Sequence, residues 1–284
     1  MYRFALCLVF CFYFISCSYC CYAKRQEGPS YSLFYEQGVR YCKDGDLQNA
    51  VLYINNALNL NPNNLSALIE LSEIFLKLKK TDLALSTLEN ALTIAPNDAL
   101  VHFLLGIAYE ETGQLNEAKL NFKNALKLDS GNVLIRSKLG LACLLSGDNK
   151  CANDNLAKVV LAYPNEIHAR AALGTNYHLA KKYGLAKDEY KFVLGYEPLN
   201  LTLLYNLAKT QLSLSQFEDA KDSLDKAISI NDTVVDLYLD RAYVLYKLGK
   251  PLDADSDYLN SHGPLGGRSA RGATCRASAD VPDS

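Results

Sequence analysis

Alanine recurs at intervals of 34 residues, seven times without a gap, and no other feature of this chain restricts its fold as strongly. A fixed period of this length is typical of stacked helical hairpins. The alanines are Ala50, Ala84, Ala118, Ala152, Ala186, Ala220 and Ala254. Each has a small residue twelve positions before it (Gly38, Ser72, Gly106, Gly140, Gly174, Ala208, Ala242) and a bulky apolar residue four positions after it (Ile54, Leu88, Phe122, Leu156, Tyr190, Leu224, Tyr258). The pattern predicts two antiparallel helices per repeat. We expect them to cross closely at the small residues, with the bulky residue filling the space beside the crossing.

The pattern resembles the tetratricopeptide repeat family, in which small residues occupy positions 8, 20 and 27, an aromatic residue lies near position 11 and proline at position 32. Here position 27 is Ala57, Ala91, Ala125, Val159, Val193, Ala227 and Ser261, and position 32 is Pro62, Pro96, Ser130, Pro164, Pro198 and Asp232. Position 11 is Tyr41, Phe75, Tyr109, Cys143, Tyr177, Gln211 and Leu245. We expect the prolines to end the second helices, because proline has no N–H group to donate. The resemblance implies an all-α, right-handed superhelical solenoid of antiparallel helix pairs over residues 31–260, with six full repeats and a shortened seventh.

Two positions depart from the family pattern. The tryptophan of position 4 is absent from every repeat, and the apolar residue of position 7 is replaced by Gln37 in the first repeat and Arg241 in the last. Terminal repeats are expected to be atypical because one face meets water. The fold prediction therefore stands despite these departures.

Residues 1–23 are predicted to be a signal sequence or a membrane anchor, followed by a linker over residues 24–30. Residues 4–23 carry no charge, and Arg3 precedes them while Lys24 and Arg25 follow. The run is long enough for a signal sequence and just long enough to span a bilayer. Three interpretations are possible: a signal cleaved after Ala23, a bacterial lipoprotein signal cleaved before a lipidated Cys17, and an uncleaved anchor. Either kind of cleaved signal is favoured over the anchor. We expect a membrane-associated or exported protein, most simply in a bacterial envelope or periplasm.

Residues 261–284 are predicted to form a disordered tail. From His262 onward the sequence lacks Lys, Asn, Ile, Phe and Tyr and is rich in Gly, Ala, Arg and Ser. Such a segment cannot bury enough apolar surface to offset its ordering entropy. Either the parent chain is truncated here and continues in unrelated sequence, or the tail is natural; the two interpretations stay open.

One cysteine pair bears on the redox compartment. Cys143 is expected in the last turn of one helix and Cys151 in the first turns of its partner, with Gly147 at the bend between them. A disulfide across this hairpin is sterically conceivable and would suit an oxidising compartment. Because position 11 is usually a core position, a buried free thiol is favoured at Cys143.

The sequence contains no pattern of catalytic or metal-binding residues. Its four histidines are scattered, and the series Asp253, Asp255 and Asp257 lacks the glycine of a calcium loop. We therefore expect no enzyme activity, cofactor or metal. The net charge of −2, without a basic stripe, argues against a nucleic-acid partner.

The resemblance implies a concave groove lined by positions 2, 5, 6, 9, 12 and 13 of each first helix. The candidate partner-binding residues are Phe103, Leu104, Ile107, Glu110, Leu134, Leu141, Tyr205 and Lys209. An apolar groove with acidic edges suits an amphipathic helix or apolar peptide with basic flanks, although part of the stripe could instead pack between repeats. We expect an adaptor or scaffold that binds a protein or peptide at the cell envelope. The alternatives are an anchored, cytosol-facing scaffold or cochaperone, or an accessory subunit of an enzyme complex. Nothing in the sequence predicts the oligomeric state.

Overall fold

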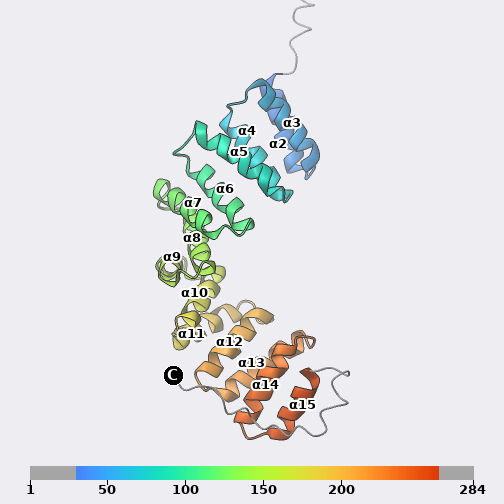
Figure 1. The fold of residues 1–284 in the computed structure, drawn as a ribbon, viewed down its shortest axis with the longest axis vertical. Coiled ribbons are helices and arrows are strands. Elements are labelled where there is room, and N and C mark those ends of the chain that lie inside the picture. Colours follow the sequence, from blue (N-terminus) through green and yellow to red (C-terminus); the bar gives the residue numbers. More distant parts are fainter. Residues whose placement is uncertain (1–29, 262–284) are drawn as a thin grey trace, which may run out of the picture. The chain divides into compact units, whose positions relative to one another are not determined.

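The structure, a computed structural model, describes residues 30–261, and this part of the chain contains fourteen helices and no strands (Figure 1). The predicted all-α class is confirmed. The predicted signal or anchor, residues 24–29 of the linker, Cys17 and the tail from His262 lie outside the described residues. Ser261, predicted to begin the tail, is instead the buried last residue of α15. The helices are α2 (Tyr31–Lys43), α3 (Leu47–Leu60), α4 (Leu65–Lys77), α5 (Thr81–Ile94), α6 (Ala99–Glu111), α7 (Leu115–Leu128), α8 (Val133–Leu145), α9 (Asn149–Ala162), α10 (Ile167–Leu179), α11 (Tyr183–Leu194), α12 (Leu201–Ser213), α13 (Phe217–Ile230), α14 (Val235–Lys247) and α15 (Pro251–Ser261). Within this range, no helix has the length and apolar character needed to cross a membrane.

The helix boundaries follow the period of the sequence. Each first helix has 13 residues and starts 34 residues after the previous first helix, from Tyr31 to Val235. Asparagine, aspartate or serine side chains cap several of these helices; Asn64, for example, accepts the N–H of Ala67 at 3.0 Å. At the other end of the hairpin, α3 stops at Leu60, two residues before Pro62, as the missing N–H group of proline predicts.

The tight turn inside each hairpin has one residue with positive φ, always at position 15 of the repeat. Glycine occupies this position in four repeats, where φ lies between 75° and 82°. Lys79, Lys181 and Ser215 occupy it in the other three, each at φ 57°. The left-handed conformation is disfavoured for residues with a Cβ atom, so these three turns carry a conformational cost that the glycine turns avoid.

The helices form two compact units, residues 1–132 and 133–284, of which the structure describes α2–α7 and α8–α15. In each unit the two helices of a repeat pack against each other, and the second helix also packs against the first helix of the next repeat. First helices of neighbouring repeats also touch, for example α4 with α6 and α10 with α12. A face lined by first helices therefore runs along each unit.

The core of each repeat is built on the predicted row of small residues. Six of the seven alanines are fully buried, and Ala254 in the last repeat is 7% exposed. The bulky residue lies directly against the small residue of the partner helix rather than beside the crossing. A Cβ atom on Gly106 would lie 2.5 Å from the Phe122 ring, and one on Gly174 would lie 2.9 Å from Tyr190. Gly38 and Gly140 meet Ile54 and Leu156 just as closely, at 2.6 and 2.7 Å, so in these four repeats the opposing side chain leaves no room for a Cβ atom.

Cys143 and Cys151 form a disulfide that joins α8 to α9, with their Cα atoms 5.7 Å apart. The expectation of a free buried thiol at Cys143 is therefore wrong. Position 11 is usually a core position, and Cys143 is indeed buried, but burial does not prevent it from bonding to Cys151. In the structure, the short turn at Gly147 brings the last turn of α8 next to the first turn of α9, so the two sulfur atoms meet.

Candidate protein-binding faces

The first-helix face of α2, α4 and α6 combines apolar and acidic side chains, and we call it the first-unit face. Its apolar members are Tyr35, Val39, Ile69, Leu100, Phe103 and Ile107, and its acidic members are Glu36, Glu70, Glu73, Glu110 and Glu111. Lys43 and Lys77 are the basic residues at the corresponding helix ends. Lys79 pairs with Glu111 at 2.7 Å, so the excess of negative over positive charge beside the apolar strip comes from the other glutamates.

The candidate residues on α6 differ in how much surface they offer. Phe103 and Ile107 are half-buried. The centre of the Phe103 ring lies 5.8 Å from the centre of the Phe122 ring in the same repeat. Leu104 is only 5% exposed and belongs to the hydrophobic core of the unit, so it supports the face from beneath. Glu110 is half-buried at the edge. Leu100, at 44% exposure, is the most accessible apolar side chain of this helix.

Two neighbouring carboxylates concentrate negative charge on α4. Burial, followed by the negative charge of Glu70, raises the pKa of Glu73 above its ordinary value, although Lys77 opposes the shift. At neutral pH a cation from a partner would relieve this unfavourable interaction. The electrostatics of the first-unit face therefore favour a positively charged ligand.

The remaining candidates lie in the second unit, on α8 and α12. Leu134 is 59% exposed and Leu141 is half-buried. The ammonium group of Lys209 lies 4.9 Å from the centre of the Tyr205 ring, within the range of a cation–π contact. The structure thus groups Phe103, Leu104, Ile107 and Glu110 on one unit, and it places Leu134, Leu141, Tyr205 and Lys209 on the other.

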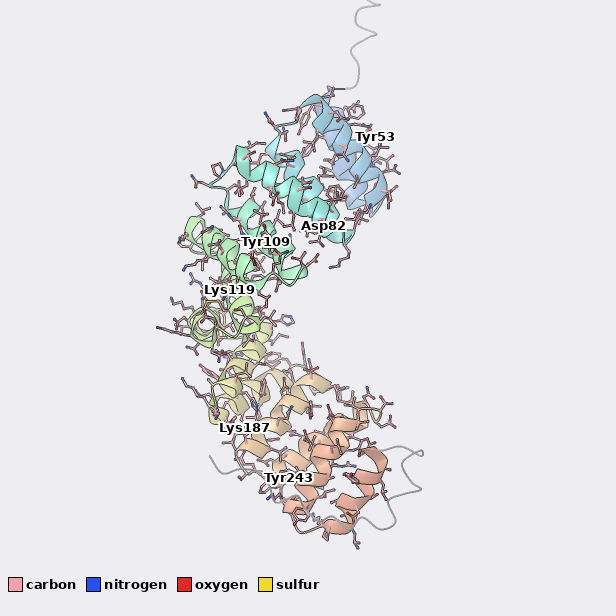
Figure 2. All side chains as sticks on the ribbon, viewed as in Figure 1. Tyr53, Asp82, Tyr109, Lys119, Lys187 and Tyr243 are labelled. Atoms are coloured by element: carbon pink, nitrogen blue, oxygen red, sulfur yellow. A yellow bond between two sulfur atoms is a disulfide. The ribbon has the colours of Figure 1, made fainter. Side chains whose placement is uncertain are left out.

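Asp240 on α14 occupies a groove position of the predicted concave face, although it is not one of the candidate partner-binding residues. Its Oδ2 atom is buried without a hydrogen-bond partner among the described residues. Burial and the adjacent Asp240 carboxylate raise the pKa of the Tyr205 phenol, which keeps that side chain protonated. Tyr243, labelled in Figure 2, is 52% exposed on the same helix. The sequence places Asp240 in the groove, but whether its Oδ2 atom has a hydrogen-bond partner is decided by side-chain geometry, which the repeat pattern does not predict.

Two histidines, His102 and His178, form hydrogen bonds within the fold. Nδ1 of His102 lies 3.1 Å from Oδ1 of Asn121, and its Nε2 lies 3.0 Å from the carbonyl oxygen of Pro96. His178 Nδ1 lies 2.8 Å from the Thr210 hydroxyl, and burial lowers the pKa of this histidine. The bonds to Asn121 and Thr210 join neighbouring helices, and the bond to Pro96 holds the loop before α6, so both side chains have a structural role.

The described helices define the class of protein: it is all-helical and built from 34-residue helix pairs. Three models of the tetratricopeptide repeat match the sequence, over residues 42–106, 99–132 and 201–233. The matched segments, residues 42–132 and 201–233, are therefore tetratricopeptide repeats. This family is generally a non-catalytic scaffold for binding protein or peptide partners. A search of curated proteins finds no match.

Solved structures share the fold at low sequence identity. A tetratricopeptide repeat protein from Parabacteroides merdae is 18% identical, with 83% of this chain and 93% of that chain covered at a TM-score of 0.63. YrrB, described as having an unusual peptide-binding site, is 22% identical, with 69% and 97% covered and a TM-score of 0.59. The type IV pilus biogenesis factor PilW is 21% identical, with 76% and 98% covered and a TM-score of 0.62.

Proposed function

We propose that this protein is an adaptor whose first-unit face binds a protein segment that carries apolar and basic side chains. The apolar strip formed by Leu100, Phe103 and Ile107, bordered by glutamates, is the observation on which the proposal rests. Apolar side chains supply binding energy by leaving water, and an excess of carboxylates selects basic partners. A helix with one apolar face and flanking lysines or arginines has this chemistry.

The similar structures support a binding role without identifying the partner. YrrB is described as a peptide-binding repeat protein and PilW as a pilus biogenesis factor. At these identities the likeness extends to the fold alone. The partner class is therefore inferred from the side chains of this chain.

The test is peptide selection on the immobilised full chain, followed by titration of a selected peptide against face variants. Replacing Leu100 or Phe103 with alanine should weaken binding by about 2 kcal/mol, roughly thirtyfold, if these side chains are central contacts. Glu110→Lys should mainly slow association of a basic peptide. The matched control is Leu120→Ala, because Leu120 is 59% exposed on α7, the other helix of the same repeat.

The thermal midpoint is measured on each variant, because Phe103 also packs on Phe122. Loss of affinity at an unchanged midpoint supports a binding face. Equal affinities for the Leu100 and Leu120 variants would show that this face does not bind the peptide. Selected peptides without basic residues would contradict the charge argument.

We further propose that the protein acts at the cell envelope, attached or exported through residues 1–23. The uncharged run over residues 4–23 supports this location, and so does the disulfide, since such bonds persist in oxidising compartments. Metabolic palmitate labelling of the wild type and Cys17→Ser tests lipidation directly. Label that disappears in the variant indicates a lipoprotein, whereas an unlabelled wild type rules it out. Protease accessibility in intact cells then reports which side of the membrane holds the repeats.

A further inference from the structure

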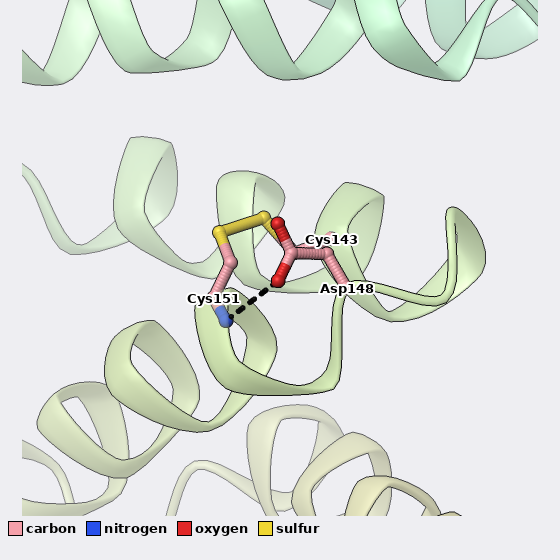
Figure 3. Close-up of side chains that lie close together, drawn as sticks. All are labelled: Cys143, Asp148 and Cys151. Carbon is pink, nitrogen blue, oxygen red and sulfur yellow. Dashed lines mark hydrogen bonds between the residues drawn. A yellow bond between two sulfur atoms is a disulfide. The ribbon is translucent and has the colours of Figure 1, made fainter.

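The α8–α9 hairpin brings two sulfur atoms and a carboxylate together (Figure 3). One donor atom each from Cys143, Asp148 and Cys151 forms a group in which all atoms lie within 4.8 Å of one another. Cys143 is fully buried, Cys151 is half-buried and Asp148 is exposed. One side of the group is therefore protein, and the other is open to solvent.

The positions of these donors are fixed by the backbone of the turn. Gly147 adopts φ 77°, which ends α8 and starts α9 within a few residues. Asp148 is the N-cap of α9, and its Oδ1 atom accepts the N–H of Cys151 at 3.1 Å. This hydrogen bond holds the carboxylate over the first turn of α9, next to the Cys151 side chain.

We propose that Cys143, Asp148 and Cys151 bind one Zn²⁺ ion whenever the disulfide is reduced. A dithiol reductant gives two electrons and two protons to the sulfur–sulfur bond, which breaks into two thiols while the reductant forms its own disulfide. Each thiol then releases one proton as its sulfur coordinates the metal. The disulfide and the zinc site therefore exclude each other. A chain that has not left a reducing compartment would hold the metal form.

The donor set suits zinc better than other common divalent ions. Thiolates bind Zn²⁺ at about 2.3 Å and carboxylates at about 2.0–2.2 Å, so two ligands of one tetrahedral ion lie about 3.5–3.8 Å apart. The two sulfur atoms, 2.05 Å apart in the disulfide, move apart to this distance once the bond is reduced, and the Asp148 carboxylate already lies within 4.8 Å of both. Calcium and magnesium require sets of oxygen ligands, which this hairpin lacks. The open side leaves the fourth position of the tetrahedron to water.

The test measures thiol protection by zinc in the full chain. The protein is reduced with a phosphine, because a dithiol would chelate the metal. It is then alkylated with and without Zn²⁺, and each cysteine is followed by peptide mass spectrometry. Zinc should slow alkylation of Cys151 by roughly tenfold or more, because a metal-bound thiolate is a poor nucleophile. Cys42, the free thiol of α2, is the internal control, and its rate should not change.

Two variants separate a three-ligand site from adventitious binding. Asp148→Asn keeps a good N-cap residue but replaces the carboxylate with a weak ligand, so it should lose most of the protection at Cys151. Cys143→Ser should lose it completely. Circular dichroism checks that both variants stay helical. The proposal is overturned if zinc does not protect Cys151 in the wild type, or if Asp148→Asn is protected as well as the wild type. Neither result depends on the partner-binding proposal, since no peptide is present.

Discussion

At the scale of single residues, the contact between each glycine of position 8 and the bulky residue 16 positions later sets the spacing of a helix pair. Gly106→Ala should lower the stability by about 1–2 kcal/mol, because the cost of overpacking against Phe122 exceeds the gain in helix propensity. Gly184→Ala on α11 is the matched control: a Cβ atom there meets nothing within 4 Å. It should leave stability unchanged or raise it by up to about 1 kcal/mol. Thermal midpoints compare the two, and equal shifts would contradict the packing described here.

A second residue-scale effect belongs to the turns with positive φ. Lys181 adopts φ 57°, whereas its neighbour Lys182 has φ −88°. Lys181→Gly should raise the stability by up to about 1 kcal/mol, because glycine adopts the left-handed conformation without the steric cost of a Cβ atom. Lys182→Gly should give no gain, since the native φ there suits any residue. If the two variants melt at the same temperature, the turn carries no strain.

At the scale of helices, Arg241 explains why the last repeat departs from the apolar pattern of position 7. Its guanidinium group pairs with both carboxylate oxygens of Asp257 on α15, at 2.6 and 2.7 Å, and with Asp225 on α13 at 2.6 Å. Asp257 is only 4% exposed. One side chain on α14 therefore joins three helices through charge-assisted hydrogen bonds.

Arg241→Ala should lower the stability by roughly 3 kcal/mol, because Asp257 would keep a buried charge without a partner. Arg241→Ala combined with Asp257→Ala should recover part of this loss.

The same ion pairs predict a pH dependence. Burial raises the pKa of Asp225, but hydrogen bonds to Lys221 and Arg241 outweigh this effect, so that the pKa is lowered overall. A lowered folded-state pKa contributes stability at neutral pH that disappears as the pH falls through the acidic range. The free energy of unfolding of the wild type and that of Arg241→Ala should therefore become more similar as the pH falls. If the gap between them does not change with pH, the ion pairs are not its cause.

The sequence predicts the helices better than it predicts contacts between their side chains. A row of alanines with exact spacing is enough to infer the helix pairs, because each repeat must bury the same positions. The burial of Leu104 and the pairing of Cys143 with Cys151 depend instead on helix rotation and turn geometry, which vary from repeat to repeat. In the sequence, Arg241 is only a charged residue at a position that is normally apolar. The structure explains it, because Asp225 and Asp257 lie where they can pair with its guanidinium group.

At the scale of the whole molecule, contacts lie between neighbouring helices, so stability should be a sum of local and nearest-neighbour contributions. A disturbance should therefore spread only to adjacent repeats. Ala186, fully buried in the fifth repeat, has neighbours on both sides, whereas Ala254 is in the last repeat that the structure describes, where Tyr258 is 47% exposed. Ala186→Leu should lower hydrogen-exchange protection across α9–α13, and Ala254→Leu should affect α13–α15 alone. Exchange measured by mass spectrometry resolves these segments. A uniform loss of protection along the chain in either variant would mean that the repeats unfold as one cooperative block, contrary to the nearest-neighbour packing seen here.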